Sequence, residues 1–450
     1  MKYFIYFFSL VFLMVSCRDD DFGKNGTGNM LLPVAFKVQV KYDNNYGQLK
    51  SKNAVVNLIN NDTNDIYTIT TDENGVAMFA SVIPGTYKIN VAKNMQAAEY
   101  FSTFGYALQS EDINFNGAQE GVMVNANVTG TQIELKAARV GDLVIKQVYY
   151  AGSNTSSGAS FRDQFIEIYN NSSEVIYADG LYIAQLYGKT STVSAAYTLA
   201  NGQFDWSQSL NMTMGSAANT DYVYSDFVIR IPGNGTQYPI QPGASIIVAA
   251  NAVNHKAPLM GNNGNPIPIQ NPALTVDLSN ADFEAYLGDF RLSIGSTVFN
   301  TDIQNPLVPD MQIAYWGRPG YYSGGTDLLF DTQGRDSFII FKSDDFNTYK
   351  DYSDPSVASV VSGTKFFLQI PTDVIIDGVD TQHYNPSSQR PKMLPASIDA
   401  SYTNVDNMYN SQAIIRKTKM TINGRIVLED TNNSANDFVK QKAEPRAFQQ

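Results

Sequence analysis

Apolar and polar residues alternate along the first part of the chain, which is typical of strands that bury one face. Every second residue from Phe36 to Tyr42 is apolar. The block 71–91 adds turn residues: Asn74-Gly75 is expected to close a tight hairpin, and Pro84-Gly85 is expected to turn the chain again. These patterns predict a β-sandwich over residues 32–137.

Strand patterns continue through the rest of the chain. A new β run starts over 141–150, and the segment 161–185 has the order strand, turn, strand. Further on, Asn423-Gly424 separates two short apolar runs and predicts a hairpin. Helical periodicity is nearly absent, and we expect at most one short helical turn over 282–287. The sequence therefore predicts an all-β protein with a second, larger β-rich module over 139–450.

The amino-terminal segment has the layout of a secretory signal. Residues 1–16 hold one lysine and an apolar run that is too short to span a bilayer, and Ser16 precedes Cys17, which is the only cysteine. This layout resembles a lipoprotein signal, in which the cysteine is acylated and anchors the chain in the membrane. A Gly/Asn-rich tether over 17–31 follows, and its Asp19-Asp20-Asp21 resembles the lipoprotein export signal of Bacteroidetes. The alternative is an ordinary buried thiol, but a polar tether cannot form a core around it.

Composition excludes some classes of partner. The formal net charge is −12 at pH 7 and the sequence contains no basic block, so nucleic acid is not expected as a ligand. With 27 Tyr and 25 Phe the chain has ample material for a core. A single cysteine allows no disulfide within the chain, so packing and backbone ladders must stabilise the fold.

Two known kinds of domain resemble parts of this sequence. The block 71–91 resembles the prealbumin-like repeats of carboxypeptidase regulatory-like and Cna-B-type domains, and this resemblance covers roughly 32–137. Such domains act as stalks or spacers. We predict no internal isopeptide crosslink, because no Lys, Asn and Glu pattern can be assigned to one.

The second half resembles a lamin-tail domain, an immunoglobulin-like sandwich, with large insertions between its strands. The matching residues are Phe165, Glu167, Tyr169, Asn170 and Ser172, then Pro242 and Gly243, then Asp377, Gly378 and Val379, and finally Arg425 with Asp430, Thr431, Asn432 and Ser434. More specifically, Val148–Ser153 and Gln164–Tyr182 resemble the Bacteroidetes lipoproteins grouped as DUF4876. That resemblance implies a sandwich followed by this module and carries no established activity.

We find no catalytic signature. Neither His255 nor His383 has a second ligand at zinc spacing, and neither a nucleophile elbow nor a dinucleotide-binding fingerprint is present. No cofactor is therefore expected. Asp-rich turns, including an expected turn at Asp377-Gly378 with Asp380, offer oxygen ligands for Ca²⁺, although they lack the register of a calcium loop.

The best candidate for a contact surface is the aromatic segment 314–325. Its rings alternate with Gly and Pro, which interrupt a strand, so some of them are expected on a loop where they can stack on a sugar. The candidate binding residues are Tyr315, Trp316, Arg318, Tyr321 and Tyr322, with Trp206 as a weaker candidate. The alternative is that these rings fill the ends of a sandwich core.

These features predict a lipid-anchored protein on the outer face of the outer membrane. The favoured hypothesis is a non-enzymatic accessory that captures a glycan or another nutrient, or docks onto a TonB-dependent outer-membrane transporter. Two alternatives remain: an extracellular hydrolase-associated protein that acts on glycans or phosphoesters, and a structural adhesin.

Overall fold

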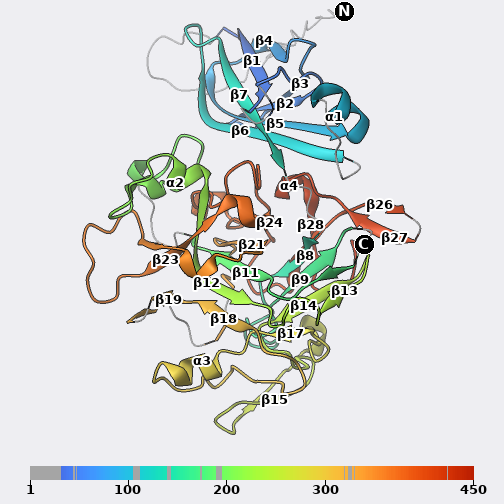
Figure 1. The fold of residues 1–450 in the computed structure, drawn as a ribbon, viewed down its shortest axis with the longest axis vertical. Helices are drawn as coiled ribbons and strands as arrows, with labels where there is room; N and C mark the ends of the chain where they lie inside the picture. Colours follow the sequence, from blue (N-terminus) through green and yellow to red (C-terminus); the bar gives the residue numbers. More distant parts are fainter. Residues whose placement is uncertain are drawn as a thin grey trace, which may run out of the picture.

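The computed structural model describes residues 32–449, except 44–45, 47, 105–111, 139–142, 173–174, 189–194, 319, 323–326, 329 and 423. The predicted signal and Cys17 lie outside the described residues. The described chain is rich in strands and confirms the prediction of an all-β fold. Figure 1 shows a smaller amino-terminal body above a larger one. None of the helices in the described part is long and apolar enough to span a membrane.

The smaller body is one sheet of seven strands that curves around its own apolar core, so its two ends face each other as the layers of a sandwich. Their order across the sheet is β3 (Ile66–Thr70), β2 (Val55–Asn60), β5 (Gly85–Gln96), β6 (Asp112–Val124), β7 (Gly130–Ala138), β1 (Val34–Tyr42) and β4 (Val76–Val82). Helix α1 (Ala97–Phe104) packs against β5 and β6. The alternating apolar residues of β1 point inward, as predicted, and Phe36, Val38 and Val40 are fully buried.

The two turns predicted in the block 71–91 are present, but neither closes a hairpin. Gly75 has a φ of +71°, and Asp72 Oδ1 accepts hydrogen bonds from the backbone N–H groups of Asn74 and Val76. The strands on either side of this turn pair elsewhere, because β3 pairs with β2 and β4 pairs with β1. β5, which follows Pro84-Gly85, likewise pairs with β2 and β6. Both turns therefore carry the chain from one part of the sheet to another.

The larger body consists of two sheets. One has the strand order β22 (Asp351–Ser353), β23 (Phe366–Pro371), β12 (Tyr222–Arg230), β11 (Tyr182–Leu186), β21 (Ser337–Phe341) and β24 (Ile375–Val379), with β18 (Gln312–Tyr315) paired to β12. The other has the order β17 (Phe283–Glu284), β14 (Ser245–Ala249), β9 (Phe165–Asn170), β8 (Leu143–Tyr149), β25 (Gln412–Arg416) and β28 (Phe438–Lys442).

These two sheets pack face to face around the largest apolar core. Ile145, Ile166 and Ile168 of one sheet meet Ile183, Ile229 and Ile340 of the other, and all six are buried. This arrangement is a β-sandwich, as the resemblance to a lamin-tail domain implied. Long insertions cover the outer face of the first sheet, where Met393 and Leu394 pack on Ile339 and Phe341.

Short elements complete the larger body. Four two-stranded ladders are described: β10 (Ile176–Tyr177) with β13 (Pro239–Ile240), β15 (Leu259–Met260) with β16 (Pro266–Ile267), β19 (Gly317–Arg318) with β20 (Tyr321–Tyr322), and β26 (Thr418–Ile422) with β27 (Arg425–Leu428). The last is the hairpin predicted at Asn423-Gly424. The helices are α2 (Ala217–Thr220), α3 (Gly288–Ser293) and α4 (Ser434–Asp437).

Two local predictions for the larger body were wrong. The helical turn expected over 282–287 is instead the short strand β17, and α3 follows it. The expected turn at Asp377-Gly378 lies inside strand β24. Gly378 is needed there for close packing, because a Cβ atom would lie 2.8 Å from Ile398 Cγ2.

Side-chain amides of the smaller body reach across to the larger one. Asn114 Nδ2 of β6 donates to the backbone carbonyl of Asp430 at 2.7 Å, and Asn116 Nδ2 donates to that of Thr431 at 2.8 Å. Lys419 Nζ lies 3.1 Å from Asp112 Oδ2 at the same junction. These contacts fix β6 against the segment that leads into α4.

Candidate functional site

The predicted aromatic segment begins in strand β18, whose pairing with β12 shifts register between Ile313 and Tyr315. Tyr315 packs with the cluster on the outer face of the sheet, whereas Trp316 enters the core between the two sheets. β18 pairs with β12, and Tyr315 lies opposite Val228. The register of this pairing therefore decides which ring can reach a ligand.

Arg318 is held beside Tyr315 by the carboxylate of Asp351, the first residue of β22. Arg318 Nε donates to Asp351 Oδ2 at 3.1 Å, and Arg318 Nη2 pairs with Asp351 Oδ1. The Tyr315 hydroxyl donates to Asp351 Oδ2 at 3.1 Å. The guanidinium also lies 3.4 Å from the centre of the Phe366 ring, which adds a cation–π contact. The guanidinium makes two parallel hydrogen bonds to the carboxylate and lies over the Phe366 ring. Together these contacts fix the direction of its remaining N–H groups.

A groove opens in front of this pair. We call it the Arg318 groove; it has a volume of about 570 Å³, which lies in the range of small-molecule sites. Aromatic side chains line much of it, and polar ones are set among them: Tyr315, Phe346, Tyr349 and Tyr352, with Asn211, Asn347, Arg318 and Lys350. This combination suits ligands that have both apolar faces and hydroxyl groups.

The groove contains two cationic donors, Arg318 and Lys350, and one tyrosine hydroxyl bound to a carboxylate. Burial raises the pKa of Tyr315, and the adjacent Asp351 raises it further, so the hydroxyl stays protonated and donates to Asp351. Among the residues that the structure describes, Arg318 Nη1 and Lys350 Nζ have no hydrogen-bond partner. Both are therefore available to a ligand.

Neither tryptophan of the candidate set lies at this surface. Trp316 is 7% exposed and packs on Phe227 and Phe290, with ring centres 5.6 and 5.4 Å apart. Trp206 is 5% exposed and stacks on Tyr224 at 3.9 Å. Trp316 and Trp206 are therefore not contact residues of this surface, because each indole ring is buried against other aromatic rings of the core.

The other two candidates lie on strand β20. The Tyr321 ring is partly buried and meets Phe366 edge to face at 5.3 Å, so it supports the ring beneath Arg318. Tyr322 is part of the β19–β20 ladder, where it is paired with Gly317, and its side chain is outside the description.

The residues behind the lamin-tail resemblance have structural roles. Glu167 is fully buried, pairs with Lys146 at 2.8 Å and accepts a hydrogen bond from the Ser245 hydroxyl at 2.5 Å. The Tyr169 hydroxyl donates to the backbone carbonyl of Ile426 at 2.6 Å. The motif thus ties neighbouring strands to the carboxyl-terminal segments.

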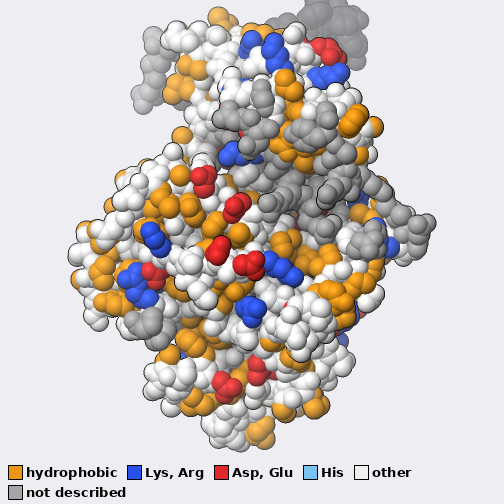
Figure 2. Space-filling model, viewed as in Figure 1, with side chains coloured by type: hydrophobic (Ala, Val, Ile, Leu, Met, Phe, Trp, Pro, Cys, Tyr) orange, Lys and Arg blue, Asp and Glu red, His pale blue; other side chains and the backbone are white. Residues whose placement is uncertain are grey.

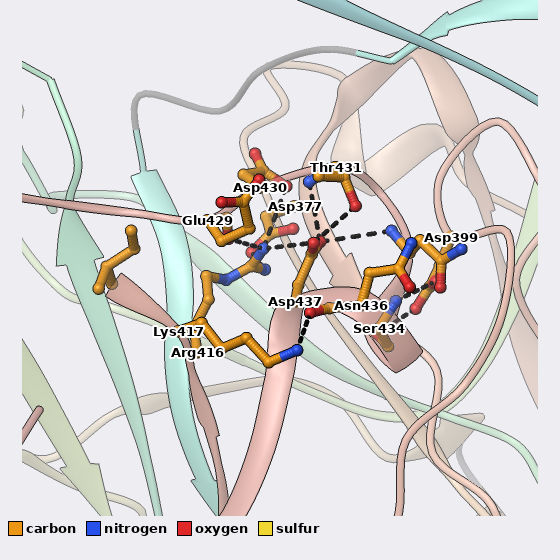
Figure 3. Close-up of polar contacts among 12 residues, drawn as sticks. Asp377, Asp399, Arg416, Lys417, Glu429, Asp430, Thr431, Ser434, Asn436 and Asp437 are labelled. Atoms are coloured by element: carbon orange, nitrogen blue, oxygen red, sulfur yellow. Dashed lines mark hydrogen bonds and ion pairs between the residues drawn. The ribbon is translucent and has the colours of Figure 1, made fainter. Parts of the chain in front are cut away.

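Arg416 forms the densest buried charge network in the described part of the chain (Figure 3). Its Nη2 lies 2.7 Å from Asp377 Oδ2, and its Nη1 lies 3.1 Å from Asp430 Oδ1 and 3.4 Å from Asp437 Oδ2. Burial acts to lower the pKa of Arg416, but these three carboxylates and that of Asp399 outweigh burial and raise the pKa. Burial also raises the pKa values of Asp377 and Asp437 to about 7.

This network is closed to ligands, since Arg416 is 1% exposed. Its function is to join β24, β25 and the segment that leads into α4. The sequence resemblance included Arg425 and Asp430 in one motif. In the structure Arg425 donates to the Asn171 carbonyl, and the arginine that contacts the Asp430 carboxylate is Arg416. An arginine at the end of the apolar run Ala413-Ile414-Ile415 was the signal that could have identified Arg416.

Both histidines make hydrogen bonds within the protein. Burial lowers the pKa of His255 to about 4, and its Nε2 lies 3.1 Å from the Asn251 carbonyl. His383 Nε2 lies 3.1 Å from Gln333 Oε1. Within the described ranges, no three His, Cys, Asp or Glu side chains are grouped so that they could hold a metal ion.

The surface carries no large field of one charge on the face drawn in Figure 2. Among the side chains coloured there, acidic and basic ones lie singly or beside one of opposite charge, among apolar and uncharged ones. Long-range electrostatic attraction should therefore contribute little to ligand binding at this face, and short-range contacts should contribute most.

The fold places this chain in a structural class. It is an all-β protein in which an amino-terminal sandwich is joined to a larger module of two packed sheets. Residues 241–445 match the family model described as protein of unknown function (DUF4876). The chain is also similar to a DUF4876 family protein from Bacteroides thetaiotaomicron VPI-5482, with 25% identity, 90% of this chain and 95% of that chain covered, and a TM-score of 0.51. These matches confirm the DUF4876 resemblance that the sequence predicted.

A candidate adhesin from Bacteroides ovatus is a more remote structural match. It has 9% identity and a TM-score of 0.17, with 55% of this chain and 86% of that chain covered. No curated protein matches this sequence.

Proposed function

We propose that this protein is a non-enzymatic surface lipoprotein that captures a ligand outside the cell in the Arg318 groove. The observation that carries the proposal is the Arg318–Asp351 pair, in which a carboxylate holds a guanidinium against Phe366. Among the described residues, Nη1 has no hydrogen-bond partner, and it lies at an aromatic groove. Such fixed donors beside rings favour binding because little conformational freedom is lost.

The proposed location depends on the amino-terminal segment. Acylation of Cys17 would anchor the chain in the outer membrane, with the 17–31 tether and the amino-terminal sandwich holding the larger body away from the lipid. In this proposal, docking onto a TonB-dependent transporter delivers the captured ligand. Replacing Cys17 by Ala should release the protein from the membrane fraction, and a variant that stays there would contradict the anchor.

The experiment for capture uses full-length protein and a matched pair of variants. Immobilised protein is exposed to a soluble nutrient extract, and retained small molecules are identified by mass spectrometry. Arg318→Ala should lose the retained compound. Arg335→Ala should keep it, because Arg335 makes the same fork on Asp331 outside the groove, with contacts of 2.8 and 2.7 Å.

The outcomes separate the hypotheses. Retention by wild type and Arg335→Ala alone supports capture at the groove. Equal retention by Arg318→Ala, or no retained compound at all, contradicts it and favours a structural adhesin. Chemical conversion of the retained compound would support the hydrolase alternative.

A further inference from the structure

The Arg318 groove does not end at Tyr349. A second hollow of about 820 Å³ lies on the other side of Tyr349 and Lys350, and both residues line both hollows. We call it the Asp373 hollow; its polar wall includes Lys342, Asp344, Asp345 and Asp373. Either hollow alone has the volume of a site for a small organic molecule, so together they offer far more room than one sugar ring needs.

The ridge between the two hollows is fixed. The Tyr349 hydroxyl donates to Ser343 Oγ at 2.7 Å, and the Tyr349 ring packs on Phe346 at 5.6 Å. Phe346 in turn stacks on Tyr182 at 4.5 Å, with the two ring planes only 10° apart. An aromatic ring held in this way gives a platform on which a flat ligand face can rest without ordering the protein first.

The charges along the combined groove nearly cancel. Arg318, Lys342 and Lys350 supply positive charge, and Asp344, Asp345, Asp351 and Asp373 supply negative charge. In the part of the chain that the structure describes, the carboxylates of Asp344 and Asp373 have no partner. A groove that contains both charged donors and charged acceptors suits a ligand with many hydroxyl groups and no net charge, because hydroxyls both donate and accept.

We propose that the captured ligand is a linear neutral oligosaccharide that crosses the Tyr349 ridge, with one part in the Arg318 groove and the rest in the Asp373 hollow. This inference rests on the proposed function and adds the class of ligand to it. It predicts that binding strengthens with chain length until both hollows are filled. It also predicts little dependence on salt, because a neutral ligand releases no counterions.

The test measures dissociation constants by calorimetry for the full-length protein with neutral glycan series, from mono- to hexasaccharide, and with acidic oligogalacturonides. Hexasaccharides should bind at least tenfold more tightly than disaccharides of the same series. The double variant Asp344→Ala/Asp373→Ala should remove that gain and leave disaccharide binding unchanged. Arg318→Ala should weaken every length, and the exposed pair Asp62→Ala/Glu73→Ala serves as the control.

Three results would overturn the inference. Equal affinity for disaccharide and hexasaccharide rejects the chain-length claim. A salt-sensitive preference for oligogalacturonides rejects the neutral ligand. The lack of any glycan binding rejects the sugar itself, and in that case the proposed function still stands if the retained-compound experiment identifies an Arg318-dependent ligand of another class.

Discussion

Asn114 of the amino-terminal sandwich donates its side-chain amide to the backbone carbonyl of Asp430, whose carboxylate contacts the buried Arg416. The junction between the two bodies is thus directly attached to the charge network inside the larger one. An amino-terminal body attached in this way is held at a set orientation to the larger body.

Removing both junction amides should loosen the two bodies from each other. The double variant Asn114→Ala/Asn116→Ala loses two hydrogen bonds and leaves two carbonyls without partners, at a cost of about 1–3 kcal/mol each. We expect faster hydrogen exchange in β6 and in the segment before α4. Asn57→Ala, which alters an exposed pair with Thr68, is the control. Unchanged exchange at the junction would show that these amides do not couple the bodies.

Arg416 should be among the most sensitive positions of the protein. Arg416→Met leaves three buried carboxylates without their cation, which should lower the free energy of unfolding by about 3–5 kcal/mol. Arg416→Lys should recover only part of this, since one ammonium cannot reproduce the fork. Urea unfolding measures the free energy of unfolding of each variant, and Arg335→Ala serves as the control. A loss below about 1 kcal/mol would indicate that the network is not stabilising.

Buried carboxyls predict a pH dependence of stability. Burial raises the pKa of Glu284 from its ordinary 4.5 to about 7 and that of Asp302 from 3.8 to about 7. At pH values between the ordinary pKa of the unfolded state and the raised pKa of the folded state, the folded state binds more protons than the unfolded state. The free energy of unfolding therefore falls as pH rises from about 4 to 7 and then levels off.

Glu284→Gln tests this pH dependence. An amide cannot ionise, so the decline should flatten by on the order of 1–3 kcal/mol, measured by denaturant unfolding at pH 5 and pH 8. Glu73→Gln at an exposed site should leave the wild-type slope unchanged. The same slope in both variants would contradict the buried-carboxyl explanation.

Trp316 should act as a core residue. Trp316→Ala removes a ring that packs on Phe227 and Phe290, and it should lower the free energy of unfolding by about 3–5 kcal/mol. Trp316→Phe should recover much of this stability. Ligand affinity, measured at a temperature where both variants are folded, should match that of wild type. A selective loss of affinity would place the indole in the binding site.

Local patterns predicted elements well where the pairing partner is close in sequence. The alternation in β1 and the Asn423-Gly424 hairpin are examples, because each follows from a few adjacent residues. The turn at Gly75 was identified but its strands were mispaired, since β4 pairs with β1 and β3 pairs with β2, and the residues around a turn do not encode pairing with other strands. Asp377-Gly378 has the signature of a turn, yet its pairing with Arg416 and the packing at Gly378 keep it in a strand.

In the aromatic segment 314–325, too, local features could be predicted from the sequence and long-range contacts could not. Composition singled out the rings around Arg318, but the pairing of β18 with β12 decides that Tyr315 faces outward and Trp316 inward. Asp351, which holds Arg318 in place, lies 33 residues further along the chain. It carries no local signal apart from its place next to Tyr352, so sequence reasoning missed it.

The most direct measurement is the ratio of dissociation constants for the captured compound between Arg318→Ala and Arg335→Ala, determined by calorimetry on full-length protein. If Arg318 donates to the ligand from its Asp351-held position, Arg318→Ala should bind at least tenfold more weakly, and Arg335→Ala should match wild type. Equal dissociation constants for the two variants would show that the ligand binds outside the Arg318 groove.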